Sequence, residues 1–259
     1  MEKLIDQLKK DGDIYKVLDK LRLVKNYSDR EHISIITKTR VVYFDEEVTK
    51  CQKDEESVLC DIIPSGFTIN NISELNIINI GAGSRTINNS LICVDFNRGL
   101  ENLDHNGVTK NCILSLCNNL PFKNDSLDGI VALHIFEHVQ DPVLTLKEWL
   151  RVIKPGARIG IVVPNFKYNW SASNDDDKYG HRWNTDPEIF KKLLDTHFSH
   201  DINIIKLNTL DMKLSFNAVI EKKGAYIPFQ FSYEKTGYEL DKGVNKEVGY
   251  YYHNDILYK

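Results

Sequence analysis

The sequence lacks an excess of positive charge, long apolar runs and the pattern of a signal peptide. Its 33 lysines and arginines are outnumbered by 37 aspartates and glutamates, which gives a formal net charge of −4. We therefore expect no nucleic-acid partner and no attraction to anionic lipid. No apolar run reaches the about 18 residues that a transmembrane helix needs, and the first residues lack the apolar core of a signal peptide. These absences predict a protein without a membrane partner.

Cysteines are few, and their spacing does not suggest pairing. There are five, an odd number, and no two of them form a C-x-x-C pair. Two of them, Cys93 and Cys112, stand in apolar, strand-like runs. We expect reduced thiols and a cytoplasmic location.

The most informative pattern that is present lies between residues 75 and 95. Residues 75–80 form an almost continuous apolar run that ends in Gly81-Ala82-Gly83, and residues 91–94 form a second run that ends in Asp95. Both runs are typical of buried parallel strands. Glycines let the backbone turn sharply and approach a ligand, and a carboxylate on the next strand can accept both ribose hydroxyls. The pair of motifs predicts a nucleoside site.

The spacing of these two motifs argues against a dinucleotide. Only eleven residues separate Gly83 from Asp95, too few for a full crossover helix and a strand. The third glycine of the G-x-G-x-x-G fingerprint is also absent. NAD and FAD are therefore disfavoured, and a nucleoside without a pyrophosphate, such as S-adenosylmethionine, fits better. A nicotinamide-dependent oxidoreductase is the weaker alternative.

Strand and helix patterns alternate further along the chain, as in a parallel α/β sheet. The later strands are expected at residues 111–116, 128–133, 158–163, 202–207 and 214–221, and helices at 142–153 and 187–197. Asp186 and Pro187 suit the N-cap and first turn of the second of these helices.

Three regions follow from this pattern. An N-terminal cap would span residues 1–70, with two short helices in 2–25 and a hairpin in 32–48. The core would span residues 71–224, including a polar lid at 165–185. An aromatic tail, residues 225–259, would pack on the core or on a partner chain.

Six motifs occur in a fixed order across about residues 75–165. They are Asn79 to Gly83, Cys93 to Asp95, Asn119 to Phe122, Ser126 to Val131, Phe136 to Pro142 and Arg151 to Gly156. In this order the sequence resembles the class I S-adenosylmethionine-dependent methyltransferases, within them the small-molecule, methyltransferase-11-like subgroup. The resemblance implies an α/β fold with a Rossmann-like, seven-stranded, mostly parallel sheet and helices on both faces. It also implies S-adenosyl-L-methionine as cofactor.

The resemblance further implies which residues hold the cofactor. We expect contacts with its methionine part from Gly81, Ala82 and Gly83, with its ribose from Asp95, with its adenine from Phe96, Leu116 and Cys117, and with its sulfonium from His134. Three positions depart from the family pattern: Asn79 and Leu116 replace acidic residues, and Arg85 replaces a third glycine. Asn79 can still hydrogen-bond the ammonium group of the cofactor, without the charge.

Two histidines are predicted to be catalytic. His134 follows the fourth expected strand, at the sheet edge where ligands bind. His181, in the lid beside Trp183, could act as a general base near neutral pH. We predict no metal site, and a cation held by His181 and the aspartates at 175–177 is the alternative.

The segment from His134 to His138 also fits H-x-x-E-H, a zinc-peptidase pattern. That pattern requires a long continuous helix, whereas His134 directly follows a strand and Asp141-Pro142 interrupts the segment. The peptidase is therefore the weaker interpretation, and His138 is interpreted as structural.

The predicted function is transfer of a methyl group to an oxygen or nitrogen of a small polar acceptor. The resemblance to bacterial methyltransferases of surface-polysaccharide and secondary-metabolite pathways implies a sugar-linked compound or a similar polar metabolite. Trp170, Tyr179 and Trp183 could stack on a sugar ring. A homodimer is one expected assembly. The alternative, favoured by Asn79 and Leu116, is a non-catalytic module that binds S-adenosylmethionine or S-adenosylhomocysteine.

Overall fold

The structure is a computed structural model of the 259-residue chain. It describes residues 53, 55–82, 87–95, 112–165, 181–210, 215–224, 251–253 and 256–258. Apart from Lys53, these residues belong to one compact unit, Glu55–Lys259. Several predicted features lie outside the described residues: the helices and hairpin of the cap, Gly83, Phe96, residues 166–180 of the lid, and most of the aromatic tail.

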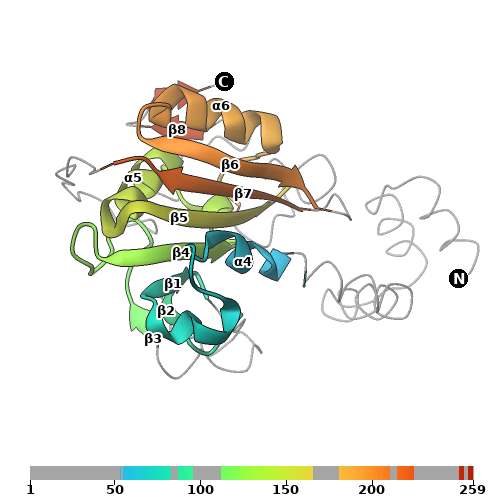
Figure 1. Cartoon of the computed structure of the whole chain (residues 1–259). Coiled ribbons are helices and arrows are strands. Elements are labelled where there is room, and N and C mark those ends of the chain that lie inside the picture. Colours follow the sequence, from blue (N-terminus) through green and yellow to red (C-terminus); the bar gives the residue numbers. More distant parts are fainter. Residues whose placement is uncertain are drawn as a thin grey trace, which may run out of the picture. The chain divides into compact units, whose positions relative to one another are not determined.

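A seven-stranded sheet forms the centre of this unit (Figure 1). Its strands are β1 (Ile77–Ile80), β2 (Ile92–Asp95), β3 (Cys112–Leu114), β4 (Leu127–Leu133), β5 (Ile153–Pro164), β6 (Ile202–Thr209) and β7 (Ser215–Lys222). They lie in the order β3-β2-β1-β4-β5-β7-β6. The first five are parallel, and β7 is antiparallel to both of its neighbours. The predicted α/β fold with a mostly parallel sheet is confirmed.

Helical segments and a hairpin accompany the sheet in the part of the chain that the structure describes. They are α4 (Val58–Ile62), η1 (Ile69–Glu74), η2 (Phe136–His138), α5 (Pro142–Val152) and α6 (Pro187–Phe198), with β8 (Tyr251–His253) paired to β9 (Ile256–Tyr258). As predicted, Asp186 caps α6, because its side chain accepts hydrogen bonds from the backbone N–H groups of Glu188 and Ile189. Among the described residues, no helix is long and apolar enough to cross a bilayer.

Several element boundaries differ from the sequence prediction, most of all the start of β5. Ile153 was expected in the helix, but it pairs with Leu127 and begins β5, five residues before the predicted start. The ladder is irregular between Leu127 and Gly129, which is how this early pairing is accommodated. Strand β3 is shorter than predicted and ends at Leu114. Tertiary pairing therefore decided both strand lengths.

Apolar side chains cover both faces of the sheet, as expected for buried parallel strands. On one face the sheet packs with residues of α5 and α6, including Trp149 and Phe190. On the other face it packs with residues of α4 and η1, including Val58 and Ile72. Helices on both faces are thus confirmed, and the strand ends remain the place where polar groups can gather.

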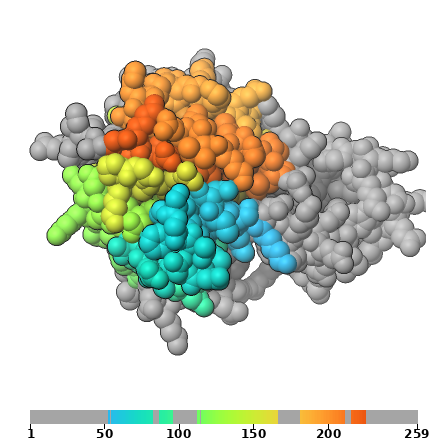
Figure 2. All heavy atoms as spheres, viewed as in Figure 1, coloured from blue at the N-terminus to red at the C-terminus, as the bar shows by residue number. Residues whose placement is uncertain are grey.

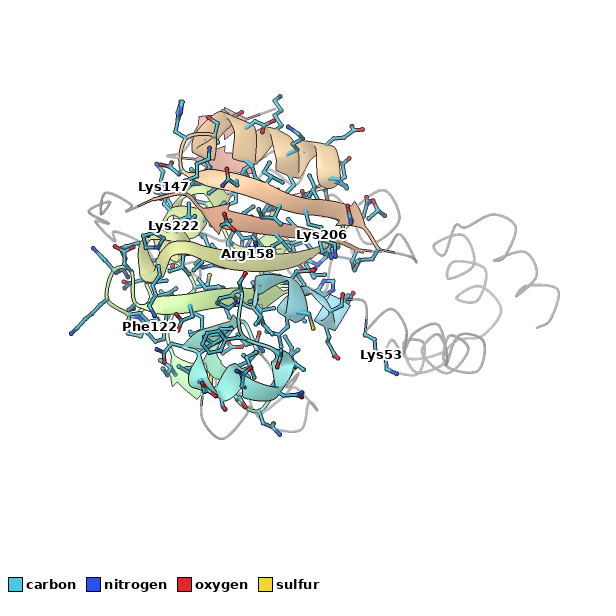
Figure 3. All side chains as sticks on the ribbon, in the orientation of Figure 1. Lys53, Phe122, Lys147, Arg158, Lys206 and Lys222 are labelled. Carbon is cyan, nitrogen blue, oxygen red and sulfur yellow. The ribbon has the colours of Figure 1, made fainter. Side chains whose placement is uncertain are left out.

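Asp61 of α4 joins this helix to the sheet. Its carboxylate accepts a hydrogen bond from Lys206 of β6, at 2.8 Å, and its carbonyl accepts one from Arg158 of β5, at 3.1 Å. Both cations lie on the face that carries α4 (Figure 3), where α4 and β6 reach the surface together (Figure 2). A groove lined by these residues, Cys60 and β6 lies here. Because Lys206 and Arg158 are both paired, we assign no ligand to this groove.

Candidate functional site

The order of the strands reverses between β1 and β4. The chain adds β2 and β3 on one side of β1, then returns to add β4 and β5 on the other side. In open α/β sheets, ligands bind at the carboxyl ends of the strands at such a reversal. Gly81 follows β1, Asp95 ends β2 and His134 follows β4. The structure therefore brings these three predicted residues to one edge of the sheet.

The glycine bend lies directly beside the strand that carries Asp95. The Gly81 N–H donates a hydrogen bond to the carbonyl of Val94, at 2.8 Å. Gly81 has a φ of +66°, and a Cβ atom built there would lie 2.7 Å from Cβ of Ile135. Ala82 is buried and packs with Cys93 and Cys112. Only glycine fits at this bend, for both backbone and packing reasons.

We expect Gly81→Ala to lower the free energy of unfolding by about 2 to 5 kcal/mol, the sum of a left-handed backbone penalty and an overpacking penalty. Chemical denaturation would measure this loss. Gly156→Ala is the matched control, because Gly156 also has a positive φ (+79°) but no described atom within 4 Å of its added Cβ. Equal losses in the two variants would show that the contact with Ile135 is unimportant.

The predicted adenine segment lies next to Asp95. The Ser115 N–H donates to the carbonyl of Asp95, at 2.9 Å, and Leu116 and Cys117 follow directly. Burial raises the pKa of the Cys117 thiol to about 12, and the charge of Asp95 adds to this effect. Asn79 is buried inside β1, in register with Cys93. The described members of the predicted cofactor set thus lie on β1 to β4 or directly after them.

An ion pair on α5 holds the Leu-Pro-Phe loop that follows this segment. The Arg151 guanidinium contacts both carboxylate oxygens of Glu148, each at 2.7 Å. It also donates to the carbonyls of Leu120 and Phe122, at 3.1 and 2.9 Å. Glu148 in turn accepts a hydrogen bond from the Leu120 N–H, at 2.7 Å. Both charged side chains, Arg151 and Glu148, therefore hold the loop against α5.

We expect Arg151→Ala to cost about 2 to 3 kcal/mol of stability, because it removes the only cation paired with the buried Glu148 carboxylate among the described residues and the donor to two loop carbonyls. Thermal or chemical unfolding would measure the loss. Lys191→Ala is the control, since its pair with Asp195 is more than half exposed on both sides and should contribute at most about 0.5 kcal/mol. A loss from Arg151→Ala as small as that of the control would contradict the assignment.

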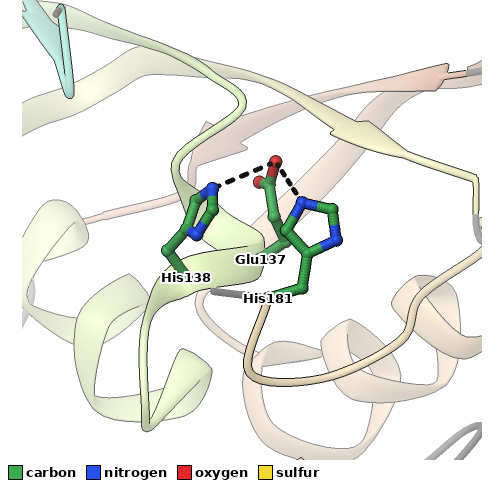
Figure 4. Close-up of side chains that lie close together, drawn as sticks. All are labelled: Glu137, His138 and His181. Atoms are coloured by element: carbon green, nitrogen blue, oxygen red, sulfur yellow. Dashed lines mark ion pairs between the residues drawn. The ribbon is translucent and has the colours of Figure 1, made fainter. Parts of the chain in front are cut away.

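Three histidines surround one buried glutamate after β4. Glu137 Oε1 lies 3.5 Å from His134 Nδ1, 3.8 Å from His138 Nε2 and 4.0 Å from His181 Nε2. Figure 4 shows His138 and His181 on opposite sides of the Glu137 carboxylate. The two rings are edge to face, with centroids 5.0 Å apart. Sequence reasoning singled out these histidines but did not predict that they meet.

His134 is held between two carboxylates. Its Nε2 lies 3.0 Å from Glu55, while Nδ1 faces Glu137. Burial lowers the pKa of the His134 imidazole, but hydrogen bonds to Glu137 and Glu55 raise it to about 10. Its φ is +54°, a conformation that costs about 1 to 2 kcal/mol in a residue other than glycine and is often found at functional sites.

The surrounding histidines lower the pKa of the Glu137 carboxyl. Burial alone would raise the pKa of this carboxyl, but the hydrogen bond to His134 and the charges of the three histidines lower it overall. His181 itself is only 6% exposed. Because both ring nitrogens of His134 face carboxylates, His181 is the better placed of the two predicted bases.

The zinc-peptidase interpretation is wrong for this segment. Residues 136–138 form a single 3-10 turn, η2, rather than the long helix that the peptidase motif requires. Trp183 is buried, and its indole N–H donates to the carbonyl of Phe136, at 3.1 Å. It is therefore a packing residue here, while Trp170 and Tyr179 lie outside the described residues.

Comparisons with known proteins add the following findings. Residues 80–161 match a family model described as a methyltransferase domain. Among solved structures, the chain is similar to a SAM-dependent methyltransferase from Aquifex aeolicus, with 15% identity, a TM-score of 0.39, and 66% of this chain and 96% of that chain covered. It is similar to one from Methanosarcina mazei, with 18% identity, a TM-score of 0.41, and coverage of 58% and 93%. A third, from Mesorhizobium loti, has 12% identity, a TM-score of 0.43, and coverage of 57% and 91%. No curated protein matches the sequence.

Proposed function

We propose that this chain, an S-adenosylmethionine-dependent methyltransferase of class I, transfers the methyl group to an oxygen or nitrogen of a small polar acceptor. The observation that carries the proposal is the hydrogen bond from Gly81 to Val94. It puts a side-chain-free bend beside a carboxylate at the point where the strand order reverses, which suits an adenosyl group. These residues suit S-adenosylmethionine, a nucleoside cofactor that has no pyrophosphate group to be bound.

When bound, the cofactor supplies an electrophilic methyl group on a positively charged sulfur. Asp95 would accept hydrogen bonds from the ribose hydroxyls, and the backbone of the Gly81 bend would approach the methionine part. Leu116 and Cys117 would contact the adenine. The main contribution of the protein would be to place the acceptor in line with the methyl group.

A hydroxyl acceptor also requires removal of a proton. We assign this step to His181, with His134 as the second candidate, because imidazole is the side chain best suited to proton transfer near neutral pH. An amine acceptor would need only to arrive unprotonated. The acidic net charge of the chain supports a small polar acceptor over a nucleic acid, and a sugar-linked hydroxyl compound is our preferred class.

The experiment is a calorimetric titration with S-adenosylhomocysteine and with NAD, followed by a methyl-transfer screen. The screen would use radiolabelled S-adenosylmethionine with nucleotide sugars, free sugars and small amines as acceptors. We expect binding of the homocysteine compound, no binding of NAD, and transfer to a hydroxylated acceptor. Binding without transfer to any acceptor would favour the non-catalytic module, and binding of NAD alone would contradict the proposal.

A further inference from the structure

Glu137, His138 and His181 bring three metal-binding atoms together. One carboxylate oxygen and one nitrogen from each imidazole all lie within 4.8 Å of one another (Figure 4). Glu137 and His138 belong to η2, and His181 comes from the segment before α6. This segment is fixed to η2 by two hydrogen bonds, from the Arg182 N–H to the Glu137 carbonyl, at 2.8 Å, and from the Trp183 indole to Phe136. The three side chains are therefore held by the backbone and do not meet by chance.

The carboxylate at the centre of this cluster has an unused oxygen. The Glu137 side chain is only 3% exposed, and its Oε2 has no hydrogen-bond partner among the described residues. A buried acceptor without a partner is unfavourable, and such groups often mark a missing ion or water. A cation held by both carboxylate oxygens of Glu137 would supply the interaction that Oε2 lacks. The unpartnered oxygen is an observation separate from the meeting of the two histidines, and it indicates a ligand of positive charge.

We propose that Glu137, His138 and His181 bind one divalent transition-metal ion, with Zn²⁺ or Mn²⁺ as the preferred ions. Two imidazoles and one carboxylate form a ligand set that leaves coordination positions open for a substrate. Imidazole nitrogens suit these ions better than Mg²⁺ or Ca²⁺, which prefer oxygen ligands.

The ligand atoms would have to draw together to hold such an ion. Ligand atoms about 2.0 to 2.1 Å from a tetrahedral metal lie about 3.3 Å apart. The two Nε2 atoms are 3.8 and 4.0 Å from Glu137 Oε1, and the ligand nitrogens of the two imidazoles lie within 4.8 Å of each other. Each side chain would therefore move toward the ion by up to about 1 Å. Beyond Glu137, His134 contacts the same carboxylate and is itself held by Glu55. Such outer partners orient the ligands of a metal site.

The site would define the class of acceptor, an inference that rests on the proposed methyl transfer. The cluster lies directly after β4, at the sheet edge where the methyl group is expected. An ion there, with open positions, would bind and orient an oxygen of the acceptor. A hydroxylated acceptor is therefore favoured over an amine. In that state His181 would serve as a ligand, and it would not also accept a proton through the same nitrogen.

Metal titrations of the full chain test the inference. The protein is first dialysed against a chelator, and Zn²⁺, Mn²⁺ and Mg²⁺ are then added separately in a calorimeter. We expect one equivalent of Zn²⁺ or Mn²⁺ to bind, and Mg²⁺ to bind at least about tenfold more weakly. Glu137→Gln and His181→Ala should each weaken binding by about 10² or more, and His134→Ala by about tenfold. His200→Ala, which removes an exposed histidine, should have no effect.

The same samples are titrated with S-adenosylhomocysteine, so that two failures can be told apart. Binding of this compound without stoichiometric metal would overturn the metal site and leave the proposed function intact. Metal binding without the nucleoside would overturn the proposed function and leave the metal site intact. Metal binding that is unchanged in Glu137→Gln, a variant of the same shape, would also contradict the site. Circular dichroism checks that each variant is folded.

Discussion

Replacing Asp95 with alanine is expected to weaken binding of S-adenosylhomocysteine by about 10² to 10⁴-fold. The carboxylate would accept two hydrogen bonds from the ribose, and hydrogen bonds to a charged group contribute about 1.5 to 3 kcal/mol each. The loss should be in affinity rather than in stability, because Asp95 is at the end of β2 and only half-buried. Isothermal titration calorimetry measures the effect directly.

Two further variants sharpen this test. Asp95→Asn keeps the shape and one acceptor, so an intermediate loss of about tenfold is expected. Asp195→Ala removes an exposed carboxylate on α6 and should leave affinity unchanged. If Asp95→Ala binds the nucleoside as tightly as the unmodified protein, Asp95 does not hold the ribose, and the assignment of the cofactor site to this strand end is wrong.

His181→Ala is expected to lower turnover by about 10² to 10⁴-fold, the range for loss of a general base. Affinity for S-adenosylhomocysteine should stay within about twofold, since the loss falls on the chemical step. Steady-state kinetics with the acceptor found in the screen would measure kcat, and calorimetry would measure cofactor affinity. Unchanged turnover would remove His181 from the mechanism.

Imidazole rescue and metal content of the His181→Ala variant distinguish the two roles proposed for His181. If His181 is a base, added imidazole should restore part of the turnover at unchanged metal content. If it is a ligand, the variant should lose its metal, and activity in the unmodified protein should disappear on chelation and return with Zn²⁺ or Mn²⁺. His200→Ala serves as control in both series, because His200 is exposed and lies on no described part of the site.

Local patterns in the sequence predicted most of the fold. The apolar runs before Gly81 and Asp95 form β1 and β2, and the pairing of Asp186 with Pro187 opens α6. Such features depend on residues that are only a few positions apart in the sequence. The spacing of apolar residues and the capping residues therefore predict them well. The order of the motifs along the sequence also predicted which strand ends would contact the cofactor.

The sequence by itself determined the strand-and-helix order, the glycine bend and the carboxylate beside it. Only the tertiary structure decided that His134 meets Glu55, 79 residues away in sequence, and that His181 joins Glu137 and His138. The physical reason is that the spacing of apolar residues along the sequence predicts which side chains are buried. The partners of polar side chains depend instead on where distant backbone segments lie in the folded chain. Hydrogen bonds from Arg182 and Trp183 to η2 fix that path, and no local pattern contains them.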